Sequence, residues 1–329
     1  MIATSSQDAA VRRGCEALVG VCANLSAGER ALIVVDRTTR EVGEALASVA
    51  QATGARVETA VIPELGFHGE EPAAEVGAAM AAADVVFAAT NMSLAHSAAC
   101  RAALAAGTRC LSLPDYSLSV LASPALLADF RALGEEAAML AGALTRAKAV
   151  RIRAAGGTDL SCAVEGRSGN SAPGRCAGPG TLASPPDSEA NIAPLEASGE
   201  GVIVVDGSIP APGLGLLDHA IELTVRDGRV VDVGGGIEAD RLRAMLDAAG
   251  DPEARTVAEI GVGLNPLASL SGVMLEDEGC RGTAHVGLGG NATIGGASQL
   301  AFHLDLVLRE AVLEVDGAQL PLARTDVLG

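Results

Sequence analysis

Two histidines and two acids near the end of the chain have the residue types and the spacing that a metal site needs. His303 and Asp305 lie two residues apart in the stretch LAFHLDLVL. His285 lies in GTAHVGLGG, and Glu259 lies in VAEIGVGLN. Imidazole nitrogens and carboxylate oxygens are the donors that zinc, manganese and iron take from proteins. These residues are therefore candidate ligands of one or more divalent cations.

The alternation of apolar and polar residues predicts that these stretches are β-strands. Neighbouring side chains of a strand point to opposite faces, so His303 and Asp305 share one face while the leucines between and after them share the other. The two polar residues would lie about 7 Å apart along the strand, which lets one cation bind between them. Small or apolar neighbours flank His285 and Glu259 in the same way.

Ordinary structural roles are the alternative for each residue taken alone. A single histidine on an apolar strand is commonly a hydrogen-bonded core residue, and Arg281 or Arg309 could pair with a buried acid. A carboxylate on an apolar strand is costly to bury unless it is paired or bound to a metal. Because three such strands occur in one chain, the sequence favours a metal site.

The first 147 residues predict an α/β domain, in which a parallel-type sheet is covered by helices. Short apolar runs alternate there with alanine-rich segments of helical period. The runs expected as strands are 30–36, 83–90 and 109–114, and the segments expected as helices are 41–55, 73–83 and 97–108. This domain is assigned to residues 1–147.

Residues 148–329 predict a β-rich α+β domain that carries the metal site. Two alternating segments around Gly156 and Gly157 indicate a β-hairpin. Residues 168–190 are rich in Gly, Pro and Ser, which predicts a long loop. Short strands with glycine turns come after it, interrupted by one expected helix at 238–250.

The charge and the composition exclude several classes of partner. The chain has 23 Lys and Arg against 41 Asp and Glu, a formal charge of −18, which disfavours nucleic acid. No apolar run has the ~18 residues of a membrane span, and the start lacks the pattern of a signal peptide. Seven scattered cysteines without a CxxC pair indicate neither a disulfide framework nor a thiolate zinc site. We therefore expect a cytoplasmic protein with no membrane partner.

Several motifs of the chain resemble the aminopeptidase T family of metallopeptidases. The motifs AEIGVGLNP, LEDEGCRGTAHVGLG, a Gly-Gly pair and HLD occur in the family's order between residues 258 and 305. The upstream stretches GGTDLSCAVEGR and SEANIAPLEASGEGVIVVDGSI are similar to the segments that open the family's metal domain. In the first half, SLAHSAACRAALAAGTRCLSLP is similar to the family's Ser-x-x-His helix and the strand after it.

This resemblance implies a set of five metal ligands and a hydrolytic activity. The implied ligands are Glu189, Glu259, His285, His303 and Asp305. The implied cofactor is one or two divalent ions of zinc, cobalt or manganese, which would activate water for hydrolysis of an amide or peptide-like bond. The implied substrate is a small molecule or a short peptide, and the implied assembly is a homo-oligomer.

One position departs from the peptidase pattern. The family has a tyrosine seven residues after the histidine of its Gly-Thr-x-His motif, where this chain has Ala292. The chain's only tyrosine, Tyr116, lies in the first domain. The departure puts a peptidase activity in doubt even where the metal ligands are kept.

The chain also resembles the related iron(II) dihydroxypyridine dioxygenases, in its length and in the motif HLDLVLR. These enzymes hold iron with two histidines and one carboxylate, and a histidine stands in the place of Glu259. A triad of His285, His303 and Asp305 would suit Fe(II) and leave open positions for oxygen. The resemblance further implies that His96 is a catalytic base.

The remaining polar residues near these motifs have open interpretations. His96 is either a base or substrate anchor, or a helix-capping or core histidine. His68 is expected at the surface or behind the site, and His219 at the start of a strand. Asp277 and Glu278 either orient a ligand histidine or form a solvated acidic turn.

The sequence therefore leads to a two-domain metalloenzyme, and three hypotheses for its activity remain. The first is a metal-dependent hydrolase that resembles aminopeptidase T. The second is a mononuclear Fe(II) dioxygenase that cleaves an electron-rich ring. The third is a metal-free binding protein of the same fold. Metal content separates them, because hydrolysis predicts about two cations, dioxygenation one iron, and binding alone none.

Overall fold

The computed structural model describes residues 6–320, which form two compact units. Unit 1 runs through Arg131 and also includes Pro173–Pro186. Unit 2 comprises Ala132–Ala172 and the chain from Asp187 onward. The sequence predicted a single boundary at 147/148. In the structure the polypeptide passes from one unit to the other at three points, after Arg131, after Ala172 and after Pro186.

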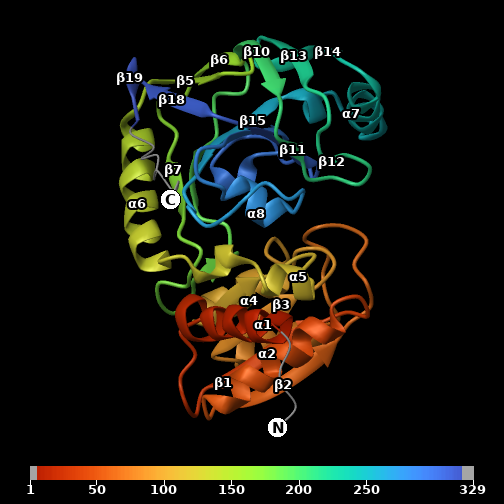
Figure 1. Ribbon diagram of the computed structural model, residues 1–329, viewed down its shortest axis with the longest axis vertical. Coiled ribbons are helices and arrows are strands. Elements are labelled where there is room, and N and C mark those ends of the chain that lie inside the picture. Colours follow the sequence, from red (N-terminus) through yellow and green to blue (C-terminus); the bar gives the residue numbers. More distant parts are fainter. Residues whose placement is uncertain (1–5, 321–329) are drawn as a thin grey trace. The chain divides into compact units, whose positions relative to one another are not determined.

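Unit 1 contains one parallel sheet of five strands in the order β2-β1-β3-β4-β8 (Figure 1). Each strand runs parallel to its neighbours. The strands are β1 (Arg30–Val35), β2 (Arg56–Val61), β3 (Val85–Ala89), β4 (Arg109–Ser112) and β8 (Leu182–Ala183). Strands β1, β3 and β4 are the three apolar runs expected from the sequence, and their residues are almost entirely buried, as a sheet covered on both faces requires.

Helices cover both faces of this sheet. The helical elements of unit 1 are α1 (Ser6–Ala17), η1 (Leu18–Cys22), α2 (Arg40–Ala52), α3 (Ala74–Ala82), α4 (Ala98–Ala105), α5 (Leu118–Leu121) and η2 (Pro124–Leu127). Helix α2 packs so closely on β1 that a Cβ on Gly43 would come within 2.5 Å of Val35. On the other face, Leu32 and Val34 share a core with Met80 of α3.

Unit 2 contains two sheets of seven strands each. Their orders are β14-β13-β10-β6-β5-β18-β19 and β12-β11-β17-β16-β15-β9-β7. The strands of the first sheet are β5 (Ala149–Ala154), β6 (Asp159–Ala163), β10 (Glu200–Val205), β13 (Ile221–Arg226), β14 (Arg229–Gly234), β18 (Ala311–Val315) and β19 (Ala318–Gln319). Those of the second are β7 (Gly169–Ala172), β9 (Glu189–Ile192), β11 (Ser208–Ile209), β12 (Gly215–Leu216), β15 (Val257–Gly263), β16 (Ala284–Gly289) and β17 (His303–Leu308).

Few helices accompany the two sheets of unit 2. They are α6 (Phe130–Arg146), α7 (Ile237–Ala248), α8 (Met274–Glu278) and the 3-10 turns η3 (Pro252–Arg255) and η4 (Ala292–Ile294). From Ala132 onward, helix α6 belongs to this unit. Strand β7 packs against it, and a Cβ on Gly169 would lie 2.3 Å from the Ala141 carbonyl oxygen. None of the helices formed by residues 6–320 has the length and apolar character that a bilayer crossing needs.

The predicted fold class is confirmed. A parallel α/β unit is followed by a unit built from antiparallel sheets, and the expected hairpin is β5 and β6, turning at Gly157 with φ +115°. The expected helix at 238–250 is α7.

The prediction of a long loop at 168–190 was wrong in part. This segment contains β7 and β8, and β9 begins at its end. Strand β7 pairs with β9, while β8 extends the unit 1 sheet beside β4. Pairing with distant strands therefore overrides a local composition that is typical of loops.

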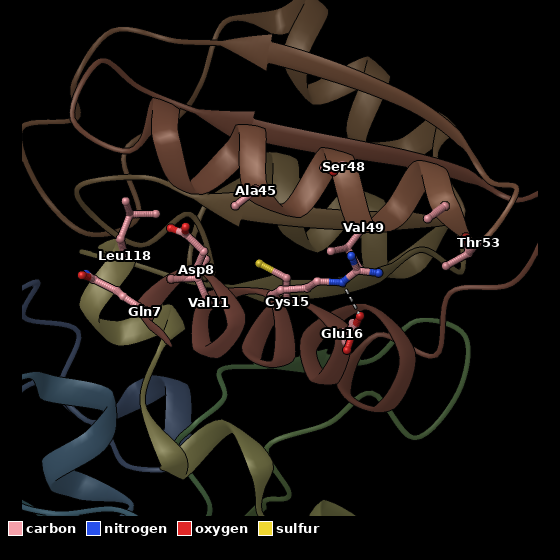
Figure 2. Close-up of a pocket in the computed structure, with 12 residues that line it drawn as sticks. Gln7, Asp8, Val11, Cys15, Glu16, Ala45, Ser48, Val49, Thr53 and Leu118 are labelled. Atoms are coloured by element: carbon pink, nitrogen blue, oxygen red, sulfur yellow. Dashed lines mark hydrogen bonds and ion pairs between the residues drawn. The ribbon is translucent and has the colours of Figure 1, made fainter. Parts of the chain in front are cut away.

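A groove of about 720 Å³ lies in unit 1 between α1 and α2 (Figure 2). An ion pair of 2.8 Å between Arg12 Nε and Glu16 Oε1 crosses part of its α1 side. Cys15, Ala45 and Val49 give it an apolar floor, and its lining contains none of the residues predicted to do chemistry.

Candidate metal centre

Four adjacent antiparallel strands of unit 2 carry the five predicted metal ligands. Strand β9 contributes Glu189, β15 contributes Glu259, β16 contributes His285, and β17 contributes His303 and Asp305. The strands lie side by side in the order β17-β16-β15-β9. The structure thus brings together residues that are more than a hundred positions apart in the sequence.

The register of these strands puts all five side chains on one face, which we call the ligand face. Residues opposite one another on neighbouring strands share a face. Gly287 lies opposite both Glu259 and Asp305, while Gly261 lies opposite His285. By the same pairing, Gly289 lies opposite His303 and Gly263 lies opposite Glu189.

The other face of the same strands is apolar and buried, as the alternation predicted. Its residues are Ala190, Ile192, Ala258, Ile260, Val262, Ala284, Val286, Leu288, Leu304, Leu306 and Leu308. Burying these side chains fixes the register, because a slip by one residue would turn the ligands into the core. The hydrophobic pattern therefore orients the polar groups.

Glycines on the ligand face make room for the imidazole rings. A Cβ at Gly261 would lie 2.0 Å from His285 Nε2. A Cβ at Gly287 would lie 2.8 Å from His303 Nε2 and 2.8 Å from the Glu259 Cβ. Glycine is thus a steric requirement at both positions, and the G-x-G spacing of these strands has a physical cause.

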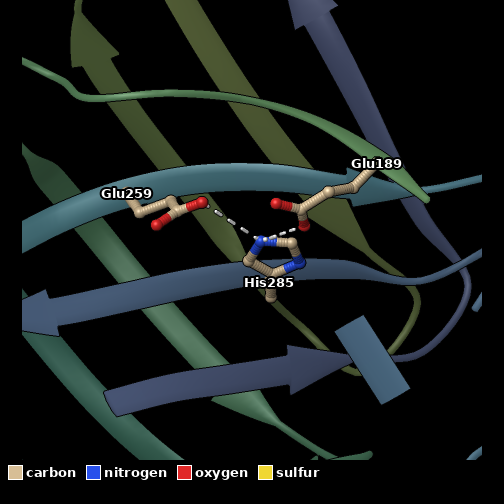
Figure 3. Close-up of side chains that lie close together, drawn as sticks. All are labelled: Glu189, Glu259 and His285. Carbon is tan, nitrogen blue, oxygen red and sulfur yellow. Dashed lines mark ion pairs between the residues drawn. The ribbon is translucent and has the colours of Figure 1, made fainter. Parts of the chain in front are cut away.

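The first group of possible ligands consists of Glu189, Glu259 and His285 (Figure 3). His285 Nε2 lies 3.0 Å from Glu189 Oε2 and 3.6 Å from Glu259 Oε1. All three side chains are buried. Two carboxylates thus converge on one imidazole nitrogen from neighbouring strands.

The second group consists of Glu259, His303 and Asp305. His303 Nε2 lies 3.3 Å from Glu259 Oε2 and 3.4 Å from Asp305 Oδ1. The Nδ1 of His303 is 2.8 Å from the Gly290 carbonyl oxygen, to which it donates when it carries the proton. In that tautomer Nε2 is left with a lone pair directed to the group, the arrangement that ligating histidines commonly have.

The donor set fits a divalent cation. Within each group the donor atoms lie within 4.8 Å of one another. Glu189 Oε2, His285 Nδ1 and Asp305 Oδ1 are buried and make no hydrogen bond. Buried carboxylate oxygens are ordinarily satisfied, and Glu189 Oε2 and Asp305 Oδ1 have imidazole nitrogens as their charged neighbours, an arrangement that suits ligands of a cation.

The arginines that could have provided a simpler explanation are engaged elsewhere. Arg281 Nη1 donates to Glu136 Oε1 at 2.9 Å, and Arg309 Nε donates to the Asp206 carbonyl at 2.9 Å. In the described chain, the ion pairs of the ligand carboxylates are with His285 and His303. Arginine pairing therefore does not account for the buried acids.

The electrostatics of the ligand face couple its acids and imidazoles. Burial lowers the pKa of His285, but Glu189 and the other carboxylates together raise it by more. The net pKa therefore lies well above its usual value. The pKa of His303 is raised in the same way, with Asp305 the main opposing partner to burial. Burial raises the pKa of Asp305, but the charge of His303 leads the effects that bring it to about 2.

Two more carboxyl groups are buried beside the ligands. Burial, followed by the charge of Glu189, raises the pKa of Asp187 well above its usual value. Burial, followed by the charge of Asp305, does the same for Glu278, which hydrogen-bonds to Asp305. Sequence patterns contain no signal for Asp187, because it lies in the segment expected as a loop.

Asp277 has a structural role instead of forming a solvated acidic turn. It is fully buried and accepts hydrogen bonds from Ser208 Oγ at 2.5 Å and from the Ser271 amide at 2.7 Å. It thereby ties the turn before α8 to β11.

His96 lies in unit 1, in the turn before α4. The cap of that helix is Ser97, whose side chain accepts from the Cys100 amide, and His96 is exposed. Capping and core roles are thus excluded, and its catalytic role stays a prediction. His68 accepts the Ser93 amide on Nδ1 at 3.0 Å. His219 is exposed and lies two residues before β13 begins, so its expected place at a strand start was wrong.

A family model, a curated relative and solved structures match the chain. The model described as NicX: 2,5-dihydroxypyridine 5,6-dioxygenase matches residues 13–323. A 2,5-dihydroxypyridine 5,6-dioxygenase of Pseudomonas putida KT2440 is 31% identical over 140 residues. That alignment spans 40% of this chain and 40% of the relative, less than half of its length.

Two solved structures share the fold. The structure of 2,5-dihydroxypyridine dioxygenase from Pseudomonas putida KT2440 superposes with a TM-score of 0.80 and 23% identity, covering 95% of both chains. Wild-type AmpT from Thermus thermophilus superposes with a TM-score of 0.66 and 19% identity, covering 96% of this chain and 98% of that one. At these identities the likeness establishes the fold alone.

Proposed function

The chain belongs to the 2,5-dihydroxypyridine 5,6-dioxygenase (NicX) family of enzymes, and from its site we propose that it is a metal-dependent hydrolase of an amide or peptide-like bond in a small substrate. The observation that carries the proposal is the position of Glu259. Its Oε1 faces His285 and its Oε2 faces His303, so one carboxylate serves both ligand groups. Shared carboxylates of this kind hold two cations in hydrolytic sites.

The residues of the ligand face would hold two divalent cations. Glu189 and His285 would complete the first site, His303 and Asp305 the second, and Glu259 would join them. Bound there, zinc, cobalt or manganese would polarise a carbonyl group and lower the pKa of a bound water. The buried acids support this occupancy, because Glu189, Glu259 and Asp305 have only imidazoles as ion-pair partners in the described chain.

The chain's own residues supply orientation and proton handling. The Gly290 carbonyl fixes the ring of His303 through Nδ1. His96 would act as a general base or as a substrate anchor from unit 1. Ala292, in place of the related peptidases' tyrosine, offers no hydroxyl, so the oxyanion donor of this proposal is not a side chain at that position.

A second candidate is a mononuclear Fe(II) dioxygenase that cleaves an electron-rich ring. The family match over residues 13–323 favours it. The triad of His285, His303 and Asp305 has the ligand types of non-haem iron sites. Against it stands Glu259, because the dioxygenases that this sequence resembles have a histidine there.

Metal content and product analysis test the two candidates together. Purification without added metal, with an anaerobic parallel for iron, is followed by elemental analysis of the protein. About two zinc, cobalt or manganese ions per chain, with cleavage of amino-acid amides, support the hydrolase. One iron per chain, with oxygen uptake on dihydroxypyridines, overturns it in favour of the dioxygenase. A chain that carries no metal and is not stabilised by added cations is a binding protein of this fold.

A further inference from the structure

A buried asparagine of β9 contacts the first metal-ligand group. Asn191 lies two residues after Glu189, on the same face of the strand, and is 5% exposed. Its Nδ2 donates to Glu189 Oε1 at 2.7 Å. The other carboxylate oxygen, Oε2, lies 3.0 Å from His285 Nε2. The two oxygens of Glu189 thus have different environments, one bonded to an amide and one directed to the ligand group.

A second asparagine fixes the orientation of the first. Asn170 of β7 lies opposite Asn191 in the sheet, and its Nδ2 donates to Asn191 Oδ1 at 3.0 Å. The same Nδ2 donates to the Ile294 carbonyl oxygen at 3.0 Å. An amide nitrogen has two hydrogens, so both are used and the amide cannot be flipped without losing both bonds. With Oδ1 of Asn191 accepting, its Nδ2 is the group left to face Glu189.

Asn170, Asn191 and Glu189 form a series of hydrogen bonds, here called the relay, from the Ile294 carbonyl in the η4 turn to the ligand face. Gly261 lies between Asn191 and His285 in the sheet. It has no side chain that would separate Glu189 from His285. The relay begins at the carbonyl of Ile294, the last residue of the turn that begins at Ala292. Side-chain amides that bond a ligating carboxylate restrict its rotation and the oxygen that it presents.

We propose that Asn191 is a positioning residue that holds Glu189 through Oε1, so that Oε2 alone is presented to a cation at the first group, and that Asn170 anchors Asn191 to the η4 turn. The inference rests on the proposed function in one respect, that the first group binds a cation. The second group has no contact of this kind with either asparagine in the described chain and serves as an internal reference.

Titration of the metal-free full-length protein with Co²⁺ tests the proposal. The variants are Asn191→Leu, which keeps the volume and loses the amide, and Asn170→Ala. The control is Asn291→Ala, a buried asparagine at the same turn that bonds Glu196 and Ser298 instead of the relay. Binding is measured by calorimetry and by the visible spectrum of bound Co²⁺, and the unfolding midpoint of each metal-free variant is recorded.

We expect Asn191→Leu to weaken one of two Co²⁺ sites by about 10- to 100-fold, the range for groups that orient metal ligands. The second site keeps close to its wild-type affinity, while the metal-free unfolding midpoint falls modestly, because Asn191→Leu removes two buried hydrogen bonds. Asn170→Ala has a smaller effect on the same site, and Asn291→Ala leaves both affinities unchanged.

Equal affinities in wild type and Asn191→Leu overturn the inference while leaving a two-cation site intact. An equal loss at both sites with a lower midpoint overturns it as well, because it shows a general loss of structure. A wild-type protein that binds only one Co²⁺ contradicts the two-cation function instead. In that case the inference stands if Asn191→Leu weakens the single site and falls if it does not.

Discussion

The chain places titratable side chains in two contrasting regions. The ligand face of unit 2 buries Glu189, Glu259 and His285 on adjacent strands, with His303 and Asp305 at its more accessible end and the polar atoms directed at one another. The second region is the set of unit 1 loops that come after β2, β3 and β4 and carry His68, His96 and Asp115, which are exposed. The first arrangement is stable only with compensating charge, because buried charges are not solvated. The second keeps access to water and suits proton transfer.

The two regions also shift imidazole pKa values in opposite directions. Although the residue is exposed at the surface, partial desolvation of its ring and the neighbouring His96 lower the pKa of His68, against a smaller raising effect of Asp115. On the ligand face, carboxylates outweigh burial and raise the pKa of His285 and His303. Strand pairing thus places acids beside imidazoles, whereas in the unit 1 loops the ring of His68 accepts a hydrogen bond from a backbone amide.

The largest expected effect comes from removing the residue that the two ligand groups share. Glu259→Gln takes a carboxylate from both groups, so we expect loss of bound metal and a fall in activity of roughly 10³-fold or more, the scale for an essential group. Elemental analysis and steady-state kinetics measure this. The matched control is Glu276→Gln, a buried acid outside both groups that contacts Ser271 and retains the metal. Full metal content in Glu259→Gln would refute the shared-ligand arrangement.

Substitution in the unit 1 loops separates catalysis from metal binding. His96→Ala is expected to lower kcat by roughly 100- to 1,000-fold, as for the loss of a general base, with unchanged metal content. His219→Ala, at an exposed histidine of unit 2, is the control and retains full activity. An undiminished kcat in His96→Ala would remove this residue from the mechanism.

Metal affinity should depend on pH through the raised imidazole pKa values of the ligand face. At neutral pH the metal-free protein keeps protons on His285 and His303 that a cation must displace. Affinity for Zn²⁺ should rise with pH throughout the range below these raised folded-state pKa values, by up to about tenfold per pH unit for each proton released. Calorimetry in buffers of different ionisation enthalpy counts the protons. A pH-independent affinity between pH 6 and 8 would contradict the raised values.

The free energy of unfolding of the metal-free protein should decrease as the pH rises, whereas the metal affinity increases. A raised folded-state pKa contributes stability that is complete below the unfolded value of about 6.5 and is lost as the pH rises through the folded value. The free energy of unfolding, measured with denaturant on the metal-free protein, should therefore decrease from pH 6 toward alkaline pH. Saturating Zn²⁺ should remove this trend, and an increase with pH in the metal-free protein would contradict it.

The smallest effect concerns the contact that joins two loops of unit 1. His68→Ala removes the acceptor of the Ser93 amide, so the free energy of unfolding should fall by about 1 kcal/mol. Metal content stays unchanged, since both residues belong to unit 1. Urea unfolding checks the first statement and elemental analysis the second. A loss of metal in this variant would show that the two regions are not independent.

The local periodicities, and the faces of the elements that they define, follow from the amino-acid sequence alone. The alternation in β15, β16 and β17 placed Glu259, His285, His303 and Asp305 on polar faces of their strands. The apolar runs and helical segments of the first half likewise identified β1, β3, β4 and their neighbouring helices. These features depend on residues two to four positions apart, and hydrophobic burial enforces them within each element.

Which elements lie side by side depends on the folded chain as a whole. The order β17-β16-β15-β9 brings Glu189 to the other ligands, out of a segment that its composition predicted to be a loop. The same pairing created the hydrogen bond between Asn170 and Asn191, for which the sequence alone contained no signal. Pairing between distant strands depends on the summed burial and hydrogen bonding of the whole sheet, so no short stretch of sequence encodes it.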